Sequence, residues 1–231
     1  MILALLAFFV GASLSSFFNV IIERRERGES WVIGRSRCDH CGKIIPWYSL
    51  IPVAGYFLSS KTCSCGGKIS PLHPLTETFG GFVAVLVLLV ITKREINGFL
   101  FTVLMVYFLF LSLEDIQFKE VYTSELFISS ILILVYRFIG EPLYFLSGLF
   151  IFFLLGAIYL LFPEGFGEGD LYFGSLLALL LPGVWMSYLY FTISFILAAI
   201  VGLTIKWRGY DIRSVPMFPF LLMGCLILYL I

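Results

Sequence analysis

The segment Gly167-Glu168-Gly169-Asp170 lies where a polar stretch meets a long apolar run, and it organises the interpretation of the chain. Asp115, much earlier in the sequence, also follows a long apolar run. An ionisable side chain near bilayer depth carries a desolvation cost, so it is by default a candidate functional residue. The two aspartates are therefore the first candidate site residues.

The composition indicates an integral membrane protein. Of the 231 residues, 60% are hydrophobic and 13% are charged, and the mean hydropathy of +1.02 lies far above that of soluble domains. Apolar runs that predict helices are Met1 to Ile22, Pro74 to Thr92, Ile96 to Leu113, Thr123 to Ile139, Pro142 to Pro163, Leu171 to Ile205 and Ser214 to Ile231. The run from 171 to 205 exceeds one crossing and contains Pro182-Gly183, so it predicts two helices. The expected fold is an all-α membrane protein with about eight transmembrane helices.

The first apolar run is expected to remain as a helix. No positive charge precedes it and no small-residue cleavage site follows it, so it does not have the pattern of a secretory signal. Its small residues, Gly11-Ala12-Ser13 and Ser15-Ser16, are of the kind that allows membrane helices to pack closely. The alternative is that they are only tolerated there.

The distribution of basic residues predicts the orientation. Eight of the 15 Lys and Arg fall in the polar segment 23–73. If this segment is cytoplasmic, eight crossings also place Lys119, Lys206, Arg208 and Arg213 inside, and Lys93, Arg94 and Arg137 outside. Twelve basic residues inside and three outside follow the positive-inside rule, so both termini are expected outside the cytoplasm. The formal net charge of zero does not indicate a partner, and no nucleic-acid partner is expected.

The polar segment contains two cysteine pairs, Cys38 with Cys41 and Cys63 with Cys65, each followed by glycine. A segment of this size cannot bury much of a core alone and usually needs a crosslink. Four thiolates on a tetrahedral zinc ion would supply one. The alternatives are two disulfides, which a reducing cytoplasm disfavours, or reduced cysteines without metal.

The two histidines, Cys225 and Glu77 each have a structural explanation that requires no role in a reaction. His40 and His73 are expected to be bystanders of the zinc site, because four cysteines already complete it. Cys225 is expected to be a small packing residue in the last helix. Glu77 lies in the first turn of a helix, where the helix dipole stabilises it, and a binding role is the alternative.

Two crossings separate the two aspartates, which predicts that both lie on one membrane face. Glycines at positions 165, 167 and 169 allow an irregular backbone and would place Asp170 near the start of a helix. The alternative is a flexible loop that ends in a helix cap, for which Gly and Asp are also favoured. Two neighbouring carboxyl groups that share one proton are the chemistry of an aspartyl protease.

The chain resembles the type IV prepilin peptidases, which are bifunctional leader peptidases and N-methyltransferases. The resemblance is carried by Asp115, Gly167 to Asp170 and the four-cysteine segment, and also by Gly11 to Asn19-Val20, Arg24, Pro46-Trp47-Tyr48 to Ile51-Pro52, Ile69-Ser70, Pro74 to Glu77 and Val215-Pro216-Met217-Phe218-Pro219-Phe220. Three features depart from the family pattern, namely the Cys63-x-Cys65 spacing, Tyr122 and Tyr172. The Cys63-x-Cys65 spacing puts the geometry of the second cysteine pair in doubt. The two tyrosines put in doubt the fine tuning of the reaction and the substrate preference, but not the reaction class.

The resemblance implies a membrane aspartyl endopeptidase of the bacterial inner membrane that removes the leader from prepilins or pseudopilins at the cytoplasmic face. It implies methylation of the new amino terminus with S-adenosylmethionine, and substrates with an N-terminal hydrophobic helix in the lipid bilayer. Asp115 and Asp170 would be catalytic, supported by Gly167 and Gly169. The four cysteines would bind structural zinc. The implied division is a first transmembrane helix (1–22), a cytoplasmic zinc-binding and methyltransferase-associated loop (23–73) and a transmembrane peptidase domain (74–231).

Three other functions stay open at this point. A presenilin-type intramembrane aspartyl protease also uses a Gly-x-Gly-Asp motif, although the cysteine segment does not suit it. A non-enzymatic membrane zinc-binding sensor or scaffold would use the aspartates only as helix caps. A proton-coupled transporter would need its acids near the bilayer midplane rather than at one face.

Overall fold

The computed structural model describes residues 1–30, 34–38, 40–59, 61–94, 96–140, 142–162, 166–209 and 214–231. Gly165 and Arg213, on which the sequence predictions partly rest, lie outside the described residues. The chain forms two compact units, Met1–Leu88 and Leu89–Ile231. In the described residues the regular elements are helices, with two isolated β-bridges beside them, so the all-α prediction is confirmed there.

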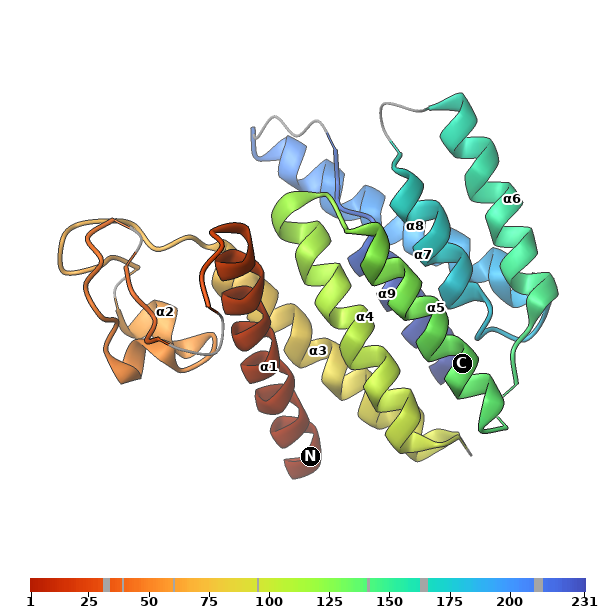
Figure 1. Cartoon of the computed structure of the whole chain (residues 1–231), viewed down its shortest axis with the longest axis horizontal. Helices are drawn as coiled ribbons and strands as arrows, with labels where there is room; N and C mark the ends of the chain where they lie inside the picture. Colours follow the sequence, from red (N-terminus) through yellow and green to blue (C-terminus); the bar gives the residue numbers. More distant parts are fainter. Residues whose placement is uncertain are drawn as a thin grey trace. The chain divides into compact units, whose positions relative to one another are not determined.

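The first unit combines two long helices with an irregular segment that carries the cysteines (Figure 1). Helix α1 (Ile2–Glu26) leads into this segment, which contains a short 3₁₀-helix η1 (Trp47–Leu50) and a short helix α2 (Ala54–Leu58). Helix α3 (Leu72–Lys93) begins in this unit and continues into the second. Helices α1 and α3 are long apolar runs, which favours helix along their whole length. The polar segment between them is shaped by local turns and by its cysteines.

Helices α1 and α3 approach closely through small residues. A Cβ atom added at Gly80 would lie 1.7 Å from Oγ of Ser15, and one added at Gly11 would lie 2.3 Å from the carbonyl oxygen of Gly80. Ala12 and Ser15 are fully buried. The predicted packing role is therefore confirmed for Gly11, Ala12 and Ser15, whereas Ser13 is exposed.

The second unit is a bundle of helices that alternate in direction along the chain (Figure 1). In order they are α4 (Gly98–Phe118), α5 (Thr123–Phe138), α6 (Phe145–Leu161), α7 (Glu168–Ala178), α8 (Gly183–Trp207) and α9 (Phe218–Leu230). Because of this alternation, α4 ends at the same end of the bundle at which α7 and α9 begin.

The predicted break in the longest apolar run is confirmed. Helix α7 ends at Ala178, and α8 starts at Gly183, whose φ of +84° favours glycine. The 11 residues of α7 span only about 16 Å, which is well short of a bilayer core. This helix therefore reaches only part of the depth that α8 can span.

Helix α9 forms the core of the second unit. It packs against α4, α7 and α8, and Leu221, Leu222, Cys225 and Leu226 along it have no exposed surface. A helix that is apolar on all sides is stable only when other elements surround it. Cys225 is a buried packing residue, as expected.

Four described helices are long and apolar enough to cross a membrane, namely α1, α3, α4 and α8. Two shorter apolar helices, α6 and α9, accompany them. Each of the eight predicted helical segments coincides with one helix of the structure, but the crossing of the bilayer by α5, α6, α7 and α9 stays a prediction.

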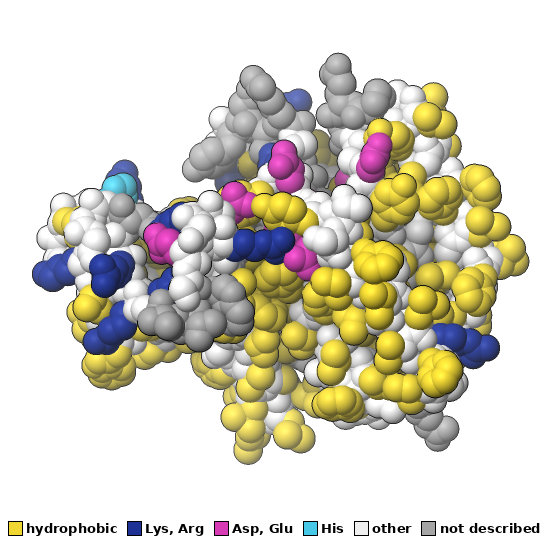
Figure 2. Space-filling model, viewed as in Figure 1, with side chains coloured by type: hydrophobic (Ala, Val, Ile, Leu, Met, Phe, Trp, Pro, Cys, Tyr) yellow, Lys and Arg dark blue, Asp and Glu magenta, His cyan; other side chains and the backbone are white. Residues whose placement is uncertain are grey.

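The outward faces of the second unit suit lipid. On α5, the side chains of Phe127, Leu134 and Phe138 are 67%, 59% and 93% exposed, and Figure 2 shows apolar side chains over the face that carries α5 and α6. Soluble proteins rarely expose contiguous apolar surface on this scale. The exposed surface and the buried α9 together indicate a bundle that uses a bilayer as its solvent.

The contact between α1 and α3 gives a stability prediction. Gly80→Ala forces the two helices apart, because the new methyl group overlaps Ser15, and we expect a loss of about 1–3 kcal/mol. Gly156→Ala in α6 is the matched control, because its new methyl group meets only Leu171 at an ordinary 3.5 Å. Thermal unfolding of the purified protein, followed by helical circular dichroism, measures both. Equal unfolding temperatures for Gly80→Ala and the wild type would contradict the close contact.

Candidate active site and metal centre

Asp115 lies in the last turn of α4, at the end of the bundle where α7 and α9 begin. Lys119 ends the helix with a left-handed backbone (φ 57°), and its N–H donates to the carbonyl oxygen of Asp115 at 2.9 Å. The carboxyl group of Asp115 is almost completely buried, with 6% of the residue exposed. Its Oδ2 accepts a hydrogen bond from the backbone N–H of Phe218 at 2.9 Å. The start of α9 therefore holds this carboxyl group in place.

Asp170 lies in the first turn of α7, at the same end of the bundle. Its Oδ2 accepts a hydrogen bond from the backbone N–H of Gly167 at 3.1 Å, which caps the helix. The helix-cap interpretation of this segment is thus correct as local structure. It also fixes the side chain, because a capping carboxylate is held by the turn that it caps. In the same turn Glu168 is exposed, and its carboxylate accepts a hydrogen bond from the Tyr159 hydroxyl at 3.0 Å.

The structure brings the two predicted aspartates together. The carboxyl groups are close enough for the charge of Asp170 to act on Asp115. Phe218 links their two helices, because its backbone binds Asp115 and its ring lies beside Gly169, with 3.4 Å from Cζ to a Cβ placed there. Gly169 thus lies directly against the Phe218 ring, and a Cβ atom there would meet the ring at an ordinary contact distance.

Aromatic stacking fixes the position of Phe218. Its ring stacks in parallel on that of Phe173 in α7, with 4.1 Å between the centroids, and Phe173 meets Phe108 of α4 edge to face at 5.3 Å. All three side chains are buried. These contacts tie α4, α7 and α9 together directly beneath the carboxyl groups.

Lys119 makes a second connection between the end of α4 and the segment before α9. Its ammonium group donates to the carbonyl oxygen and the hydroxyl of Ser214, at 2.9 and 3.1 Å. With the bond from Phe218 to Asp115, residues 214–218 are held at both ends. The positive charge of Lys119 also acts on Asp115.

Two carboxyl groups at close range can divide acid and base functions. Full ionisation of both is unfavourable, so one tends to hold a proton while the other is a carboxylate. Such a pair can activate a water molecule and polarise a carbonyl group at the same time.

The sequence did not predict the contacts that Phe218 makes with Asp115 and Phe173. The two prolines at 216 and 219 predicted a broken helix start near the face of the aspartates, and α9 does begin at Phe218. Nothing in the spacing indicated that this N–H would bind Asp115 or that the ring would lie on Phe173. These contacts join residues far apart in the sequence, so only the tertiary structure could reveal them.

In the first unit, the four predicted cysteines form one cluster. Their sulfur atoms all lie within 4.8 Å of one another, and the distances Cys38–Cys65 and Cys41–Cys63 are both 3.9 Å. A tetrahedral zinc site with Zn–S bonds of about 2.3 Å requires sulfurs about 3.8 Å apart. The donor set and the spacing therefore fit a single zinc ion, whereas the sulfurs are too far apart for disulfides.

Each cysteine pair sits in a hydrogen-bonded turn that a glycine closes. The N–H of Gly42 donates to the carbonyl of Cys38 at 2.8 Å, and the N–H of Gly66 donates to that of Cys63 at 2.9 Å. Both glycines have positive φ, at 68° and 83°. The Cys-x-Cys pair thus keeps a turn that is one residue shorter, and its sulfurs still reach the cluster.

The four sulfurs do not titrate alike. The N–H of Cys65 lowers the pKa of Cys63 to about 6, because a hydrogen bond stabilises the negative sulfur. At Cys41 a backbone hydrogen bond at Lys43 lowers the pKa, but hydrogen bonds with the other sulfurs and loss of water outweigh it and raise the pKa to about 11. Thiolates, rather than thiols, are the ligands of zinc. In the described residues, the group of possible metal ligands consists of the four cysteines and includes neither His40 nor His73.

Comparison with known proteins concerns mainly the first unit. Residues 9–91 match the family model described as bacterial peptidase A24 N-terminal domain. A prepilin leader peptidase/N-methyltransferase of Myxococcus xanthus (strain DK1622) is 37% identical over 81 residues, which are 35% of this chain and 24% of the relative. A protein of the same name from Klebsiella pneumoniae is 36% identical over 86 residues, covering 34% of this chain and 38% of the relative.

The chain matches about a quarter and two fifths of the length of these two relatives. No solved structure matches the chain significantly. The part matched by the family model contains most of α1, the cysteine cluster and most of α3, and it lies before Asp115. The N-terminal region of the chain is therefore similar to the N-terminal domain of bacterial A24 peptidases and to the corresponding part of proteins named prepilin leader peptidase/N-methyltransferase.

Proposed function

We propose that this protein is an aspartyl endopeptidase of the bacterial inner membrane. It removes the leader peptide from type IV prepilins or pseudopilins at the cytoplasmic face and methylates the new amino terminus. The observation that carries the peptidase assignment is the pairing of Asp115 and Asp170 at one end of the second unit, held by the N–H groups of Phe218 and Gly167. The names of the relatives support the substrate class and the second activity.

In the proposed peptidase reaction, one aspartate is a carboxylate and the other carries a proton. The carboxylate takes a proton from a water molecule as that water attacks the scissile carbonyl. The protonated partner polarises the carbonyl and then helps the amine to leave. Because the two groups titrate as a pair, the roles belong to the dyad rather than to one residue.

The location of the dyad suits a substrate that lies in the membrane. A prepilin has an apolar helix whose leader emerges at the cytoplasmic boundary, and the aspartates sit where α4 ends and α7 begins. Helix α7 has 11 residues, whereas α8 has 25, so α7 spans less of the bilayer depth. We propose that the leader approaches the dyad from the side of α7.

In the first unit, the four cysteines would hold a structural zinc ion that crosslinks the two turns. The chemistry of the donor set supports this role, because four thiolates complete the coordination of zinc and leave no open position for a reaction. S-adenosylmethionine, when bound, would supply the methyl group for the amino terminus.

The first prediction concerns the aspartates. Asp115→Asn and Asp170→Asn remove the shared proton chemistry but keep side-chain size, so we expect leader cleavage to fall at least about a hundredfold. A gel shift of a prepilin in membranes that contain each variant measures the rate. Glu168→Gln is the matched control in the same motif, because its side chain is exposed and bonded to Tyr159. Normal cleavage by either Asn variant would leave the aspartates as helix caps only.

The second prediction concerns Phe218. Phe218→Leu keeps the N–H bond to Asp115 but removes the stack on Phe173, so the start of α9 shifts. We expect roughly a 10- to 100-fold loss of cleavage, because catalytic groups tolerate little displacement. Phe220→Leu, two residues later and only partly buried, should cleave at close to the wild-type rate. Equal rates for both variants would exclude a positioning role for the Phe218 ring.

The third prediction concerns zinc. The purified protein should contain about one zinc ion per chain, and Cys63→Ser or Cys65→Ser should lose most of it, since three thiolates close a site poorly. Cys225→Ala should keep its zinc, because Cys225 is buried in α9. Mass spectrometry of the metal content measures each variant. A wild-type protein without stoichiometric zinc would argue for metal-free cysteines.

A further inference from the structure

Lys119 ends α4 with a backbone conformation that favours glycine. Among the described residues other than glycine, Val53, Lys61 and Lys119 have positive φ, at 63°, 63° and 57°. This conformation costs free energy for a residue with a Cβ atom, and glycine is the usual residue where a helix ends in it. A larger residue that keeps such a backbone is therefore expected to make a contact that a glycine could not make.

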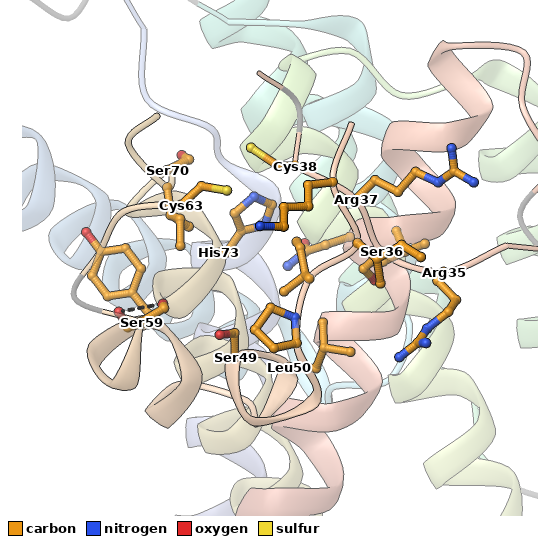
Figure 3. A pocket seen from close by; sticks show the side chains of 18 of the residues that line it. Arg35, Ser36, Arg37, Cys38, Ser49, Leu50, Ser59, Cys63, Ser70 and His73 are labelled. Carbon is orange, nitrogen blue, oxygen red and sulfur yellow. Dashed lines mark hydrogen bonds between the residues drawn. The ribbon is translucent and has the colours of Figure 1, made fainter. Parts of the chain in front are cut away.

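The positive φ of Val53 coincides with a contact between distant segments. The N–H of Val53 donates to the carboxylate of Glu77 in α3 at 2.6 Å, and this charge-assisted bond helps to offset the strain of the turn. Glu77 lines a cavity of about 850 Å³ within the first unit, and Figure 3 shows Cys38 and Cys63 at the same cavity. The strained residue is thus held by a bond that ties the polar segment to a helix.

The side chain of Lys119 makes a long-range contact in the second unit. Its ammonium group donates to the carbonyl oxygen and the hydroxyl of Ser214, which lies 95 residues later in the chain. Shortly after Ser214, the N–H of Phe218 donates to the carboxylate of Asp115. The N–H of Lys119 donates to the carbonyl oxygen of Asp115. These bonds form a closed ring between the end of α4 and the start of α9, with a carboxyl group and an ammonium group in it.

The contacts of Lys119 do not account for the stability of the second unit. The residue is exposed, and exposed charged contacts contribute little because water and salt screen them. Buried apolar side chains form the core around α9 instead. What the ammonium group provides is a fixed cation near the dyad, and its positive charge acts on Asp115.

A fixed cation suits a pair of carboxyl groups of which one must be ionised. Two carboxylates at close range repel each other, and a positive charge nearby favours the state in which one of them is charged. The contact with Ser214 also restrains the segment that leads to the Phe218 N–H. Restraint of this kind matters for catalysis, because a displacement of about 1 Å can lower a rate roughly a hundredfold.

We propose that Lys119 is a positioning residue of the peptidase, whose ammonium group holds Ser214 so that the Phe218 N–H stays on Asp115, and whose charge keeps one carboxyl group of the dyad ionised. The inference rests on the proposed peptidase function and adds a residue to it. Lys119 acts through Asp115 rather than on the substrate. Its loss should therefore lower kcat and leave KM nearly unchanged.

The test replaces Lys119 in the full-length protein with glycine and with arginine. Lys119→Gly relaxes the backbone and removes the ammonium group, so the unfolding temperature should stay within about 3 °C of the wild type while kcat falls about tenfold or more. Lys119→Arg keeps the charge and the donors, so its kcat should stay within about threefold of the wild type. Gel-shift time courses at several prepilin concentrations give kcat and KM.

Lys61→Gly is the matched control. Lys61 follows the short helix α2 of the first unit, has the same backbone conformation as Lys119, and places its ammonium group 5.8 Å from the centre of the Phe57 ring. The same substitution there relaxes the same conformation and removes the same charge, but it does so in the other unit. This variant should cleave prepilin with the kcat of the wild type.

A wild-type kcat in Lys119→Gly would overturn the inference, and so would equal losses of kcat in Lys119→Gly and Lys61→Gly. A raised KM with unchanged kcat would place Lys119 in substrate binding instead, and loss of the fold in Lys119→Gly would make it a structural residue only. All of these results leave the peptidase function intact as long as Asp115→Asn and Asp170→Asn abolish cleavage. A wild-type protein that does not cleave prepilin would refute the peptidase function and this inference with it.

Discussion

The hydrogen bond from the Phe218 N–H to the Asp115 carboxylate is the contact on which the second unit depends. It joins the end of α4 to the start of α9, and the stack of Phe218 on Phe173 brings α7 to the same point. A buried carboxyl group needs such a partner, because loss of water is costly for a charged oxygen. One bond therefore serves the fold and orients a candidate catalytic group.

The membrane explains why the partner is a backbone group. Helices in a bilayer satisfy their own N–H groups except in the first turn, where four remain available. Helix α9 is surrounded by α4, α7 and α8, so its first turn is buried in the bundle rather than in water. Asp115 uses an N–H group of this buried turn, and Asp170 uses one at the start of α7. Each aspartate thus accepts a hydrogen bond from a backbone N–H group at the start of a helix, where that group has no partner within its own helix.

The polar segment of the first unit is held in place by other contacts. This segment is too short for a core of its own, and the structure holds it through the cysteine cluster at one side and the Val53–Glu77 bond at the other. The cavity lies between these attachments, with its walls fixed by α1 and α3. The match to the family model, over residues 9–91, falls almost entirely on this unit.

The sequence by itself determined the helical class, the break at Gly183, and the four cysteines as one candidate set of metal ligands. These features arise from local composition and spacing, which a linear pattern records directly. The tertiary structure alone decided that Phe218 holds Asp115, that a shorter cysteine turn still completes the cluster, and that Glu77 binds a strained Val53. Each of these depends on one backbone N–H or sulfur meeting a group far away in the chain. Apolar periodicity shows which segments are buried, but several packings bury the same segments, and only the folded arrangement selects among them.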